Sequence, residues 1–193
     1  MTQAIILAGG FSSRAGMNKM TLPFRGKPLI GHAVACVAPF VDQIIVVTGR
    51  YHDDIVEVLS AYPNVTFVRN PLFEKGMFDS IKCGVGAASG DMLILPGDMP
   101  LIRPETVDAL LRGTGDIRVP AYRKQTGHPI FLAARLRTRL LAADDSDDLR
   151  RFRDRIGCTV VQTDDPGILV DIDSIDDYRK LKKGNEEVPP HED

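Results

Sequence analysis

The feature that most restricts the fold of this chain is a repeated order of short apolar runs and amphipathic segments. Five short, largely apolar runs recur along the sequence, at residues 4–8, 44–47, 65–68, 92–95 and 159–162. Several are apolar throughout instead of alternating with polar residues, which is typical of strands covered on both faces in a parallel sheet. We therefore expect these runs to be buried strands.

Segments with helical periodicity lie between these runs. Their apolar residues are Leu29, Ala33 and Val37; Ile55, Leu59 and Tyr62; Ile81, Val85 and Ala88; and Val107, Leu110 and Leu111. Alternation of strand and helix predicts βαβ units with right-handed crossovers. The predicted fold class is therefore α/β, a three-layer αβα Rossmann-like domain with a mostly parallel sheet.

The second half of the chain is less regular. Its candidate strands are 117–121, 130–132 and 168–172, and its candidate short helices are 133–142 and 147–156. The acidic run Asp-Asp-Ser-Asp-Asp at 144–148 follows the first of these helices and overlaps the start of the second. Asp and Ser cap helix N-termini, so we expect this run to form a turn and a helix start, with a metal site as the alternative.

The C-terminal region is predicted to form one more helix, from Ser174 to Lys183, with Ser174 as its N-cap. Ile175, Tyr178 and Leu181 fall on one face of this helix. The polar, Pro-containing tail at 184–193 is expected to be disordered. No repeat or linker interrupts the chain, so residues 1–183 are predicted to form a single domain.

Bulk composition excludes several classes of function. A formal net charge of −2 over 193 residues gives no basic footprint for nucleic acid. No apolar run is long enough to cross a membrane, and the N-terminus lacks a signal peptide, so we expect no membrane partner and a cytoplasmic location. The three cysteines, Cys36, Cys83 and Cys158, are far apart and are each predicted to be small core residues.

The first apolar run leads directly into a Gly-rich segment, so that Leu7 to Lys19 form a candidate phosphate-binding loop. Ligands of open parallel sheets bind beyond the carboxyl ends of the strands. Glycines there let backbone N–H groups turn toward an anion, and Arg14 and Lys19 add positive charge. The segment matches neither the P-loop nor the GxGxxG pattern. A surface loop with two solvated cations is the alternative.

Three aspartates are candidates for a Mg²⁺ site. Asp98 follows the run at 92–95, which places it at the same rim as the Gly-rich loop. Asp171 and Asp173 are expected on one face of a short strand, where either could complete the site. The alternatives are ordinary turn chemistry for Asp98 and a helix start for Asp173.

Two further segments are candidates for substrate contacts. Residues 70–85 pass through Gly76 into a helix whose N-terminus is expected to face the cleft, and residues 126–132 contain His128. Solvated helix positions remain the alternative for Ser80 and Lys82. A structural role remains the alternative for His128.

Taken together, these segments resemble the MobA-like nucleotidyltransferases of molybdenum cofactor synthesis, most closely the cytidylyltransferase branch. The resemblance rests on residues 7–19, 47–49, 70–82, 96–100, 127–132 and 171–178. It implies a nucleotidyltransferase fold and transfer of a nucleotidyl group from an NTP to the phosphate of molybdopterin, with Mg²⁺ as cofactor and pyrophosphate as product. A molybdoenzyme that receives the product is a candidate partner.

The resemblance also implies roles for individual residues. Arg14, Lys19 and Asp98 are the expected catalytic residues, and Mg²⁺ is expected at Asp98 with Asp171 or Asp173. The expected nucleotide-binding residues are Leu7, Ala8, Gly9, Gly10, Ser12, Arg14, Lys19, Thr48, Asn70 and Asp98. The expected contacts with the acceptor are Gly76, Ser80, Gly127, His128 and Pro129.

The choice of base and acceptor stays open at the level of sequence. Residues 73–82, 97–100 and 127–131 favour CTP, but the start Leu7-Ala8-Gly9-Gly10 is that of the guanylyltransferase branch, which uses GTP. A sugar phosphate or polyol phosphate is an alternative acceptor. An oxidoreductase, or a nucleotide-binding accessory protein of a molybdoenzyme without activity, is the alternative from another class.

Overall fold

The first strand, β1 (Thr2–Ala8), lies inside the sheet and organises the domain. In the computed structural model, which describes residues 1–9, 18–144 and 146–186, β1 pairs in parallel with β4 (Gln43–Thr48) and with β6 (Asp91–Pro96). Both neighbours are largely apolar and buried, as expected for strands with helices on each face. The predicted strands at 4–8, 44–47 and 92–95 are therefore confirmed.

The complete sheet has eight strands in the order β10-β7-β9-β6-β1-β4-β5, with β8 paired to β7. The other strands are β5 (Val65–Arg69), β7 (Ile117–Tyr122), β8 (Gln125–Thr126), β9 (Ile130–Leu132) and β10 (Thr159–Gln162). β9 runs antiparallel to β6 and β7, and β8 runs antiparallel to β7. The remaining pairs of this sheet are parallel, so the predicted α/β class with a mostly parallel sheet is confirmed.

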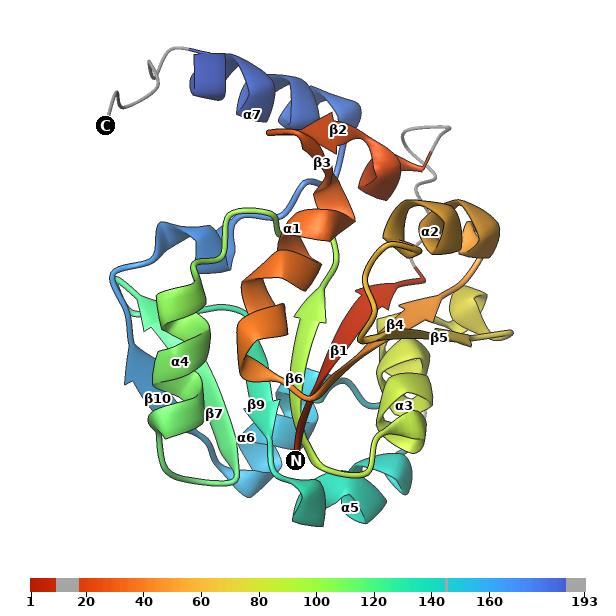
Figure 1. Cartoon of the computed structure of the whole chain (residues 1–193). Coiled ribbons are helices and arrows are strands. Elements are labelled where there is room, and N and C mark those ends of the chain that lie inside the picture. The colour runs from red at the N-terminus through yellow and green to blue at the C-terminus, as the bar shows by residue number, and fades with distance from the viewer. Residues whose placement is uncertain (10–17, 145, 187–193) are drawn as a thin grey trace.

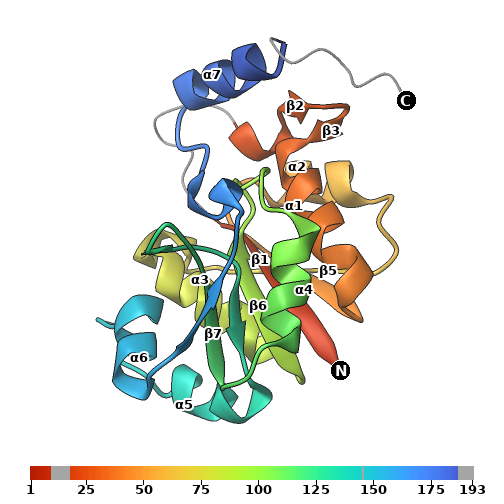
Figure 2. The ribbon, with the colours of Figure 1, turned by 90° about the vertical axis from the view of Figure 1, so that its left-hand side faces the viewer.

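Helices cover both faces of the sheet (Figures 1 and 2). One layer contains α1 (Leu29–Val37), α2 (His52–Leu59) and α4 (Pro104–Arg112), and its apolar side chains form one core with β1, β4 and β6. The other contains α3 (Met77–Ala87), α5 (Arg137–Leu141) and α6 (Leu149–Ile156), which form a second core. The sheet thus carries two separate cores, one on each face.

A smaller layer lies at the carboxyl ends of the central strands. The hairpin of β2 (Pro23–Phe24) and β3 (Lys27–Pro28) packs with the final helix, α7 (Ile175–Glu186), around Phe24, Leu29 and Ile172. Tyr178 and Leu181 contact this small core, as the predicted face requires. Figure 1 shows α7 crossing above the hairpin.

The start of α7 confirms the predicted cap. The Ser174 hydroxyl accepts a hydrogen bond from the Asp177 amide at 3.1 Å, and the Asp177 carboxylate accepts one from the Ser174 amide at 2.9 Å, so the two residues form a capping box. The hydrogen bond from Ser174 lowers the pKa of Asp177. The helix continues to Glu186, three residues beyond the predicted end, and 187–193 lie outside the described residues.

Five short 3₁₀ helices connect these elements in the part of the chain that the structure describes. They are η1 (Lys19–Thr21), η2 (Ala38–Phe40), η3 (Phe73–Lys75), η4 (Ala134–Leu136) and η5 (Pro166–Leu169). The predicted helices at 133–142 and 147–156 correspond to η4 with α5 and to α6. Asp148 caps α6 by accepting a hydrogen bond from the Arg151 amide, which confirms the helix start predicted for the acidic run.

Three predictions from the sequence were wrong. Residues 168–172 do not form a strand, because Asp165 accepts a hydrogen bond from the Gly167 amide and starts η5 instead. As a result, Asp171 and Asp173 do not share a strand face. The runs at 65–68 and 159–162 form strands, but β5 and β10 are the edge strands of the sheet, so that β5 is only partly buried and β10 is mostly exposed.

The third error concerns the cysteines. Cys36 is buried in α1, and burial raises the pKa of its thiol to about 12. Cys83 is only partly buried, and Cys158 is exposed just before the edge strand β10. The prediction of a small core residue is confirmed for Cys36 and fails for Cys158.

One buried cation stabilises the layer that contains α4. Arg118 on β7 donates from Nη1 to the carbonyls of Leu110 and Leu111 at the end of α4 and of Gly113 beyond it. Its guanidinium also lies 3.3 Å from the centre of the Phe131 ring. Arg118 therefore satisfies carbonyl groups that the helix end leaves without partners.

Among the described residues, no helix has the length and apolar character needed to cross a membrane.

Candidate functional site

The candidate site lies where the chain changes direction across the sheet. From β1 the chain proceeds to β4 and β5 on one side, and then returns to β6 on the other side of β1. The carboxyl ends of β1 and β6 therefore form a switch point, the usual ligand site of open α/β sheets. The Gly97 amide donates to the Leu7 carbonyl at 2.9 Å, which holds Gly9 and Asp98 at neighbouring strand ends.

Lys19, the first residue of η1, also lies at this rim. Its Nζ donates to Asp98 Oδ2 at 2.8 Å and lies 3.7 Å from Asp173 Oδ1, while the side chain is only 9% exposed. Asn18 fixes the turn, because its side chain accepts a hydrogen bond from the Met20 amide. The structure thus brings Lys19, Asp98 and Asp173 together at one rim.

Asp171 lies at the edge of the same group. The pKa of its carboxyl is raised, first by partial burial and then by the negative charges of Asp173 and Asp98. The positive charge of Lys19 acts in the opposite direction and lowers this pKa. The carboxylates at this rim therefore repel one another, an arrangement that a cation would relieve.

The carboxylates at this rim are too few to coordinate Mg²⁺ by themselves. They fit a Mg²⁺ ion whose other ligands come from a substrate and from water. In residues 1–9, 18–144 and 146–186, no group of three His, Cys, Asp or Glu side chains could hold a metal ion. Mg²⁺ is commonly bound through one or two carboxylates together with water and substrate phosphates. Asp98 and Asp173 match that pattern.

A pocket of about 270 Å³, called here the reaction pocket, opens beside Asp98. It is lined by Leu7, Gly9, Met20, Phe73, Glu74, Gly76, Met77, Ser80, Pro96 and Asp98. Three of these (Leu7, Gly9 and Asp98) were predicted to bind the nucleotide, and two (Gly76 and Ser80) were predicted to contact the acceptor. The structure therefore brings members of both predicted sets into one cavity.

Buried hydrogen bonds shape the wall of the reaction pocket. The Asn70 side chain donates to Ser80 Oγ at 3.1 Å and accepts from the Leu72 amide at 2.9 Å. Ser80 is 4% exposed, so it is not a solvated helix position. A Cβ on Gly9 would lie 3.0 Å from Ser80 Oγ, so this wall stands directly against the end of β1.

The neighbouring strand end is equally close-packed. Thr48 is fully buried, and its Oγ1 lies 2.7 Å from His52 Nδ1. A Cβ on Gly49 would come within 2.7 Å of the Gly9 carbonyl oxygen, so only glycine fits there without displacing the rim. Thr48, like Asn70, thus supports the pocket from behind and does not line it.

A second cavity of about 770 Å³, called here the side pocket, adjoins the first and shares Leu7 and Met77 with it. Gly127 and His128 lie in its wall. A Cβ on Gly127 would come within 2.1 Å of the Ile168 carbonyl oxygen, so glycine permits close contact with η5. Pro129 is buried and follows a cis peptide bond, and it is not among the lining residues.

Burial lowers the pKa of His128, so the ring is neutral at physiological pH. Its Nδ1 is buried and has no hydrogen-bond partner among the residues that the structure describes. Of the remaining predicted site residues, Ala8 is buried at the end of β1, while Gly10, Ser12 and Arg14 lie outside the described residues.

Sequence reasoning missed three cations in the wall of the side pocket. Lys124 comes from the turn between β7 and β8, and Arg150 and Arg153 come from α6. The available signal was the run from Leu149 to Ile156, in which four of eight residues are arginine.

Comparison with known proteins assigns the family. The model of the MobA-like NTP transferase domain matches residues 4–161. The molybdenum cofactor cytidylyltransferase of Escherichia coli (strain K12) is 28% identical over 190 residues, which cover 95% of this chain and 97% of that protein. A probable molybdenum cofactor guanylyltransferase of Thermococcus sibiricus is 32% identical over 113 residues, covering 54% and 51%.

Solved structures agree with this assignment. A nucleotidyl transferase from Methanothermobacter thermautotroptrophicus superposes with a TM-score of 0.81 and 27% identity, covering 95% of this chain and 97% of that one. Both the sheet with its switch-point site and the similarity of most of the sequence point to one conclusion. The chain belongs to the MobA-like NTP transferase family and is a nucleotidyltransferase of that family.

Proposed function

We propose that this protein transfers a cytidylyl group from CTP to the terminal phosphate of molybdopterin and releases pyrophosphate. The observation that carries the proposal is the reaction pocket, in which Asp98 and Gly9 share one cavity with Gly76 and Ser80. Transfer between two substrates requires that both reach the same point. The near full-length similarity to the Escherichia coli cytidylyltransferase supports the choice of base and acceptor.

The reaction needs one substitution at phosphorus. An oxygen of the acceptor phosphate attacks the α-phosphorus, a new P–O bond forms, and the bond from the α-phosphorus to the bridging oxygen breaks as pyrophosphate leaves with the electron pair. The acceptor phosphate is already anionic and needs no general base. Catalysis then depends on positioning and on stabilising charge at the phosphate oxygens.

Lys19 is suited to that task because its ammonium group is already held at the rim by Asp98 and Asp173. A group fixed before the substrate arrives needs little reorganisation during the reaction. We assign Arg14 to the same task, together with the backbone of Gly9 and Gly10 and the Ser12 side chain. Thr48 and Asn70 maintain the wall beside the nucleotide.

We also propose that Asp98 and Asp173 hold Mg²⁺, with Asp171 close by. The ion would supply positive charge to the phosphate oxygens. The repulsion that raises the pKa of Asp171 supports a cation at this place. We further place the protein in the cytoplasm, where a molybdoenzyme would receive its product.

The proposal is tested by measuring pyrophosphate release from purified protein with Mg²⁺ and each of the four NTPs, with and without molybdopterin. We expect release with CTP that depends on molybdopterin. Preference for GTP would assign guanylyl transfer instead, in line with the Thermococcus sibiricus relative. Release only with a sugar phosphate or polyol phosphate would contradict the acceptor, and no release with any combination would contradict the proposed function.

A further inference from the structure

The side pocket has the position expected for the part of the acceptor that does not react. It shares the lining residues Leu7 and Met77 with the reaction pocket, and its volume of about 770 Å³ is well above the 270 Å³ of the reaction pocket. Its walls are α3 and α6, which lie on the same face of the sheet (Figure 2). A substrate whose phosphate lies near Asp98 can therefore extend its body into the side pocket.

The lining combines an apolar floor with an excess of positive charge. Phe78, Ile94 and Leu149 belong to the floor. The charged residues are Lys124, Arg150, Arg153 and a single carboxylate, Asp148. The negative charge of Asp148 is already paired with Arg151, which is not in the lining. The same carboxylate also caps α6. The cavity is therefore positively charged as well as apolar.

The cations differ in how fully they are engaged. Arg153 pairs with Asp154 on the same helix and is 14% exposed. Among the residues that the structure describes, no ion pair is found for Lys124 or Arg150. These two are free to bind a negative group in the pocket.

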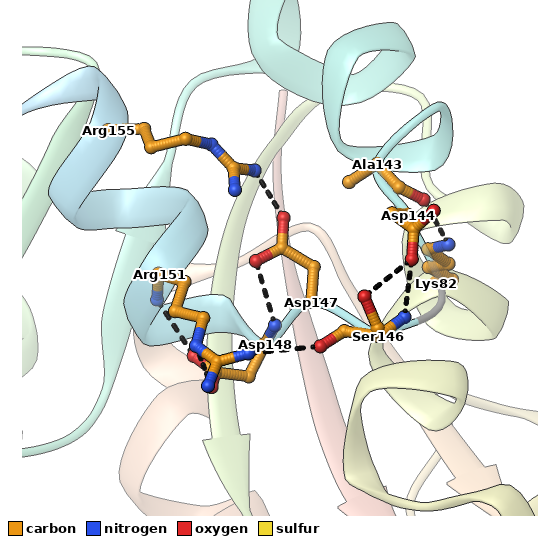
Figure 3. A network of polar contacts seen from close by, with 8 residues as sticks. All are labelled: Lys82, Ala143, Asp144, Ser146, Asp147, Asp148, Arg151 and Arg155. Carbon is orange, nitrogen blue, oxygen red and sulfur yellow. Dashed lines mark hydrogen bonds and ion pairs between the residues drawn. The ribbon is translucent and has the colours of Figure 1, made fainter.

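A polar network fixes the start of α6 (Figure 3). Arg150 is the second residue of this helix. Asp147 pairs with Arg155 in the last turn of α6, and Arg151 donates to the Ser146 carbonyl at 3.2 Å. The Asp144 carboxylate accepts a hydrogen bond from the Ser146 amide at 2.8 Å. Lys82 on α3 donates to the Ala143 carbonyl, which ties this network to the opposite wall of the pocket.

The turn that carries Lys124 contains residues that are unfavourable for its backbone conformation. Tyr122 pairs with Gln125, so Arg123 and Lys124 form a two-residue hairpin loop with φ values of 46° and 70°. Such loops strongly favour Asn-Gly or Asp-Gly, because both positions need a positive φ. Side chains other than these are strained there, and strain of this kind is concentrated at functional sites.

We propose that Lys124, Arg150 and Arg153 bind a second anionic group of the acceptor, a thiolate or oxyanion on its ring system, while the ring rests on the apolar floor of the side pocket. This inference rests on the proposed function, and it assigns these three residues to recognition of the acceptor.

The test measures binding and transfer separately, under anaerobic conditions, with molybdopterin as the probe. Binding to the nucleotide-free protein is followed by pterin fluorescence, and transfer by pyrophosphate release with CTP. The variants are Arg150→Gln, Arg150→Lys and Lys124→Gly. Arg112→Gln is the matched control, because Arg112 is an exposed arginine of α4, on the opposite face of the sheet.

We expect Arg150→Gln to weaken molybdopterin binding and raise its KM about tenfold, the usual worth of a hydrogen bond to a charged group, with the KM for CTP unchanged. Arg150→Lys should recover part of the loss, and Arg112→Gln should behave as wild type. Lys124→Gly should raise Tm by relieving the turn and still weaken binding. A merely structural residue would not separate stability from binding in this way.

Each other outcome is decisive. If the wild type binds molybdopterin and both pocket variants bind it within twofold of the wild type, the inference is wrong while the proposed function can stand. If the wild type binds molybdopterin with the expected loss in the variants but transfers nothing to it, the proposed function fails and the pocket assignment holds. No binding by the wild type would overturn the inference.

Discussion

Lys19 Nζ lies 2.8 Å from Asp98 Oδ2, and this contact connects the segment after β1 to the turn after β6 across the switch point of the sheet. Both side chains are largely buried, at 9% and 15% exposed. Burying an unpaired charge costs free energy. Each of these residues therefore offsets the cost of burying the other when no substrate is bound. The same contact places a cation and a carboxylate side by side, where a phosphate and its counter-ion would arrive.

Replacement of Asp98 by Asn should remove activity without unfolding the protein. The amide keeps the shape of the side chain, and Lys19 retains Asp173 at 3.7 Å. Loss of the charge that would hold Mg²⁺ should lower kcat for pyrophosphate release by at least about 100-fold, while the circular dichroism spectrum stays that of the wild type. Asp108→Asn on α4 serves as control, and near-normal turnover of Asp98→Asn would show that the metal assignment is wrong.

A methyl group at Gly49 should disturb the reaction pocket. The added Cβ of Gly49→Ala would lie 2.7 Å from the Gly9 carbonyl oxygen and 2.8 Å from Phe73 Cβ. Overpacking of this kind costs about 1–3 kcal/mol, and the shift of Gly9 should raise the KM for the nucleotide. Gly86→Ala is the matched control, since a Cβ there meets nothing within 4 Å, and it should stabilise α3 by up to about 1 kcal/mol. Urea unfolding and steady-state kinetics measure the two effects, and an unchanged KM for Gly49→Ala would contradict the pocket geometry.

His128 should make stability depend on pH below neutrality. Its pKa is lowered in the folded protein, mainly by burial, whereas in the unfolded chain it titrates near 6.5. As pH falls below 6.5, the unfolded state binds a proton that the folded state does not, so stability is lost by up to about 1.4 kcal/mol per pH unit. His128→Gln should remove this loss. Urea unfolding of both proteins at pH 7.5, 6.5 and 5.5 measures it, and parallel curves would refute the assignment.

Arg118 should matter for folding and not for catalysis. Replacing it by Met leaves the carbonyls of Leu110, Leu111 and Gly113 without their donor and removes the contact with Phe131. The free energy of unfolding should fall by about 2–3 kcal/mol. Arg112→Met removes an exposed i,i+4 pair and should change it by less than about 0.5 kcal/mol. Equal losses in the two variants would rule out the capping role.

The layered fold could be predicted because strands covered on both faces are apolar throughout, as in β1 and β4. The order of neighbours in the sheet could not be read from the same pattern. Val160 is 46% exposed because β10 has a partner on one side only, yet its run looks like a buried strand. Residues 168–172 carry a similar pattern, but the hydrogen bond from Gly167 to Asp165 turns the chain before it can join the sheet.

The site was partly predictable for a related reason. Asp98 could be located because the end of a buried strand marks the rim of the sheet. The contact of Lys19 with Asp173 could not, since it depends on how α7 packs over the hairpin. The cations of the side pocket were missed because Lys124 and Arg150 are far apart in sequence, and a run of arginines on a helix also fits a solvated surface.

The packing of α7 on the hairpin also has a consequence for the order of events during synthesis. The Tyr178 hydroxyl donates to the Pro23 carbonyl at 2.6 Å, across 155 positions of sequence. A ribosome therefore completes the whole sheet before the segment that brings Asp173 to Lys19 is available. A nascent chain in which β1 to β10 have folded therefore lacks the contact between Asp173 and Lys19 until α7 has docked on the hairpin.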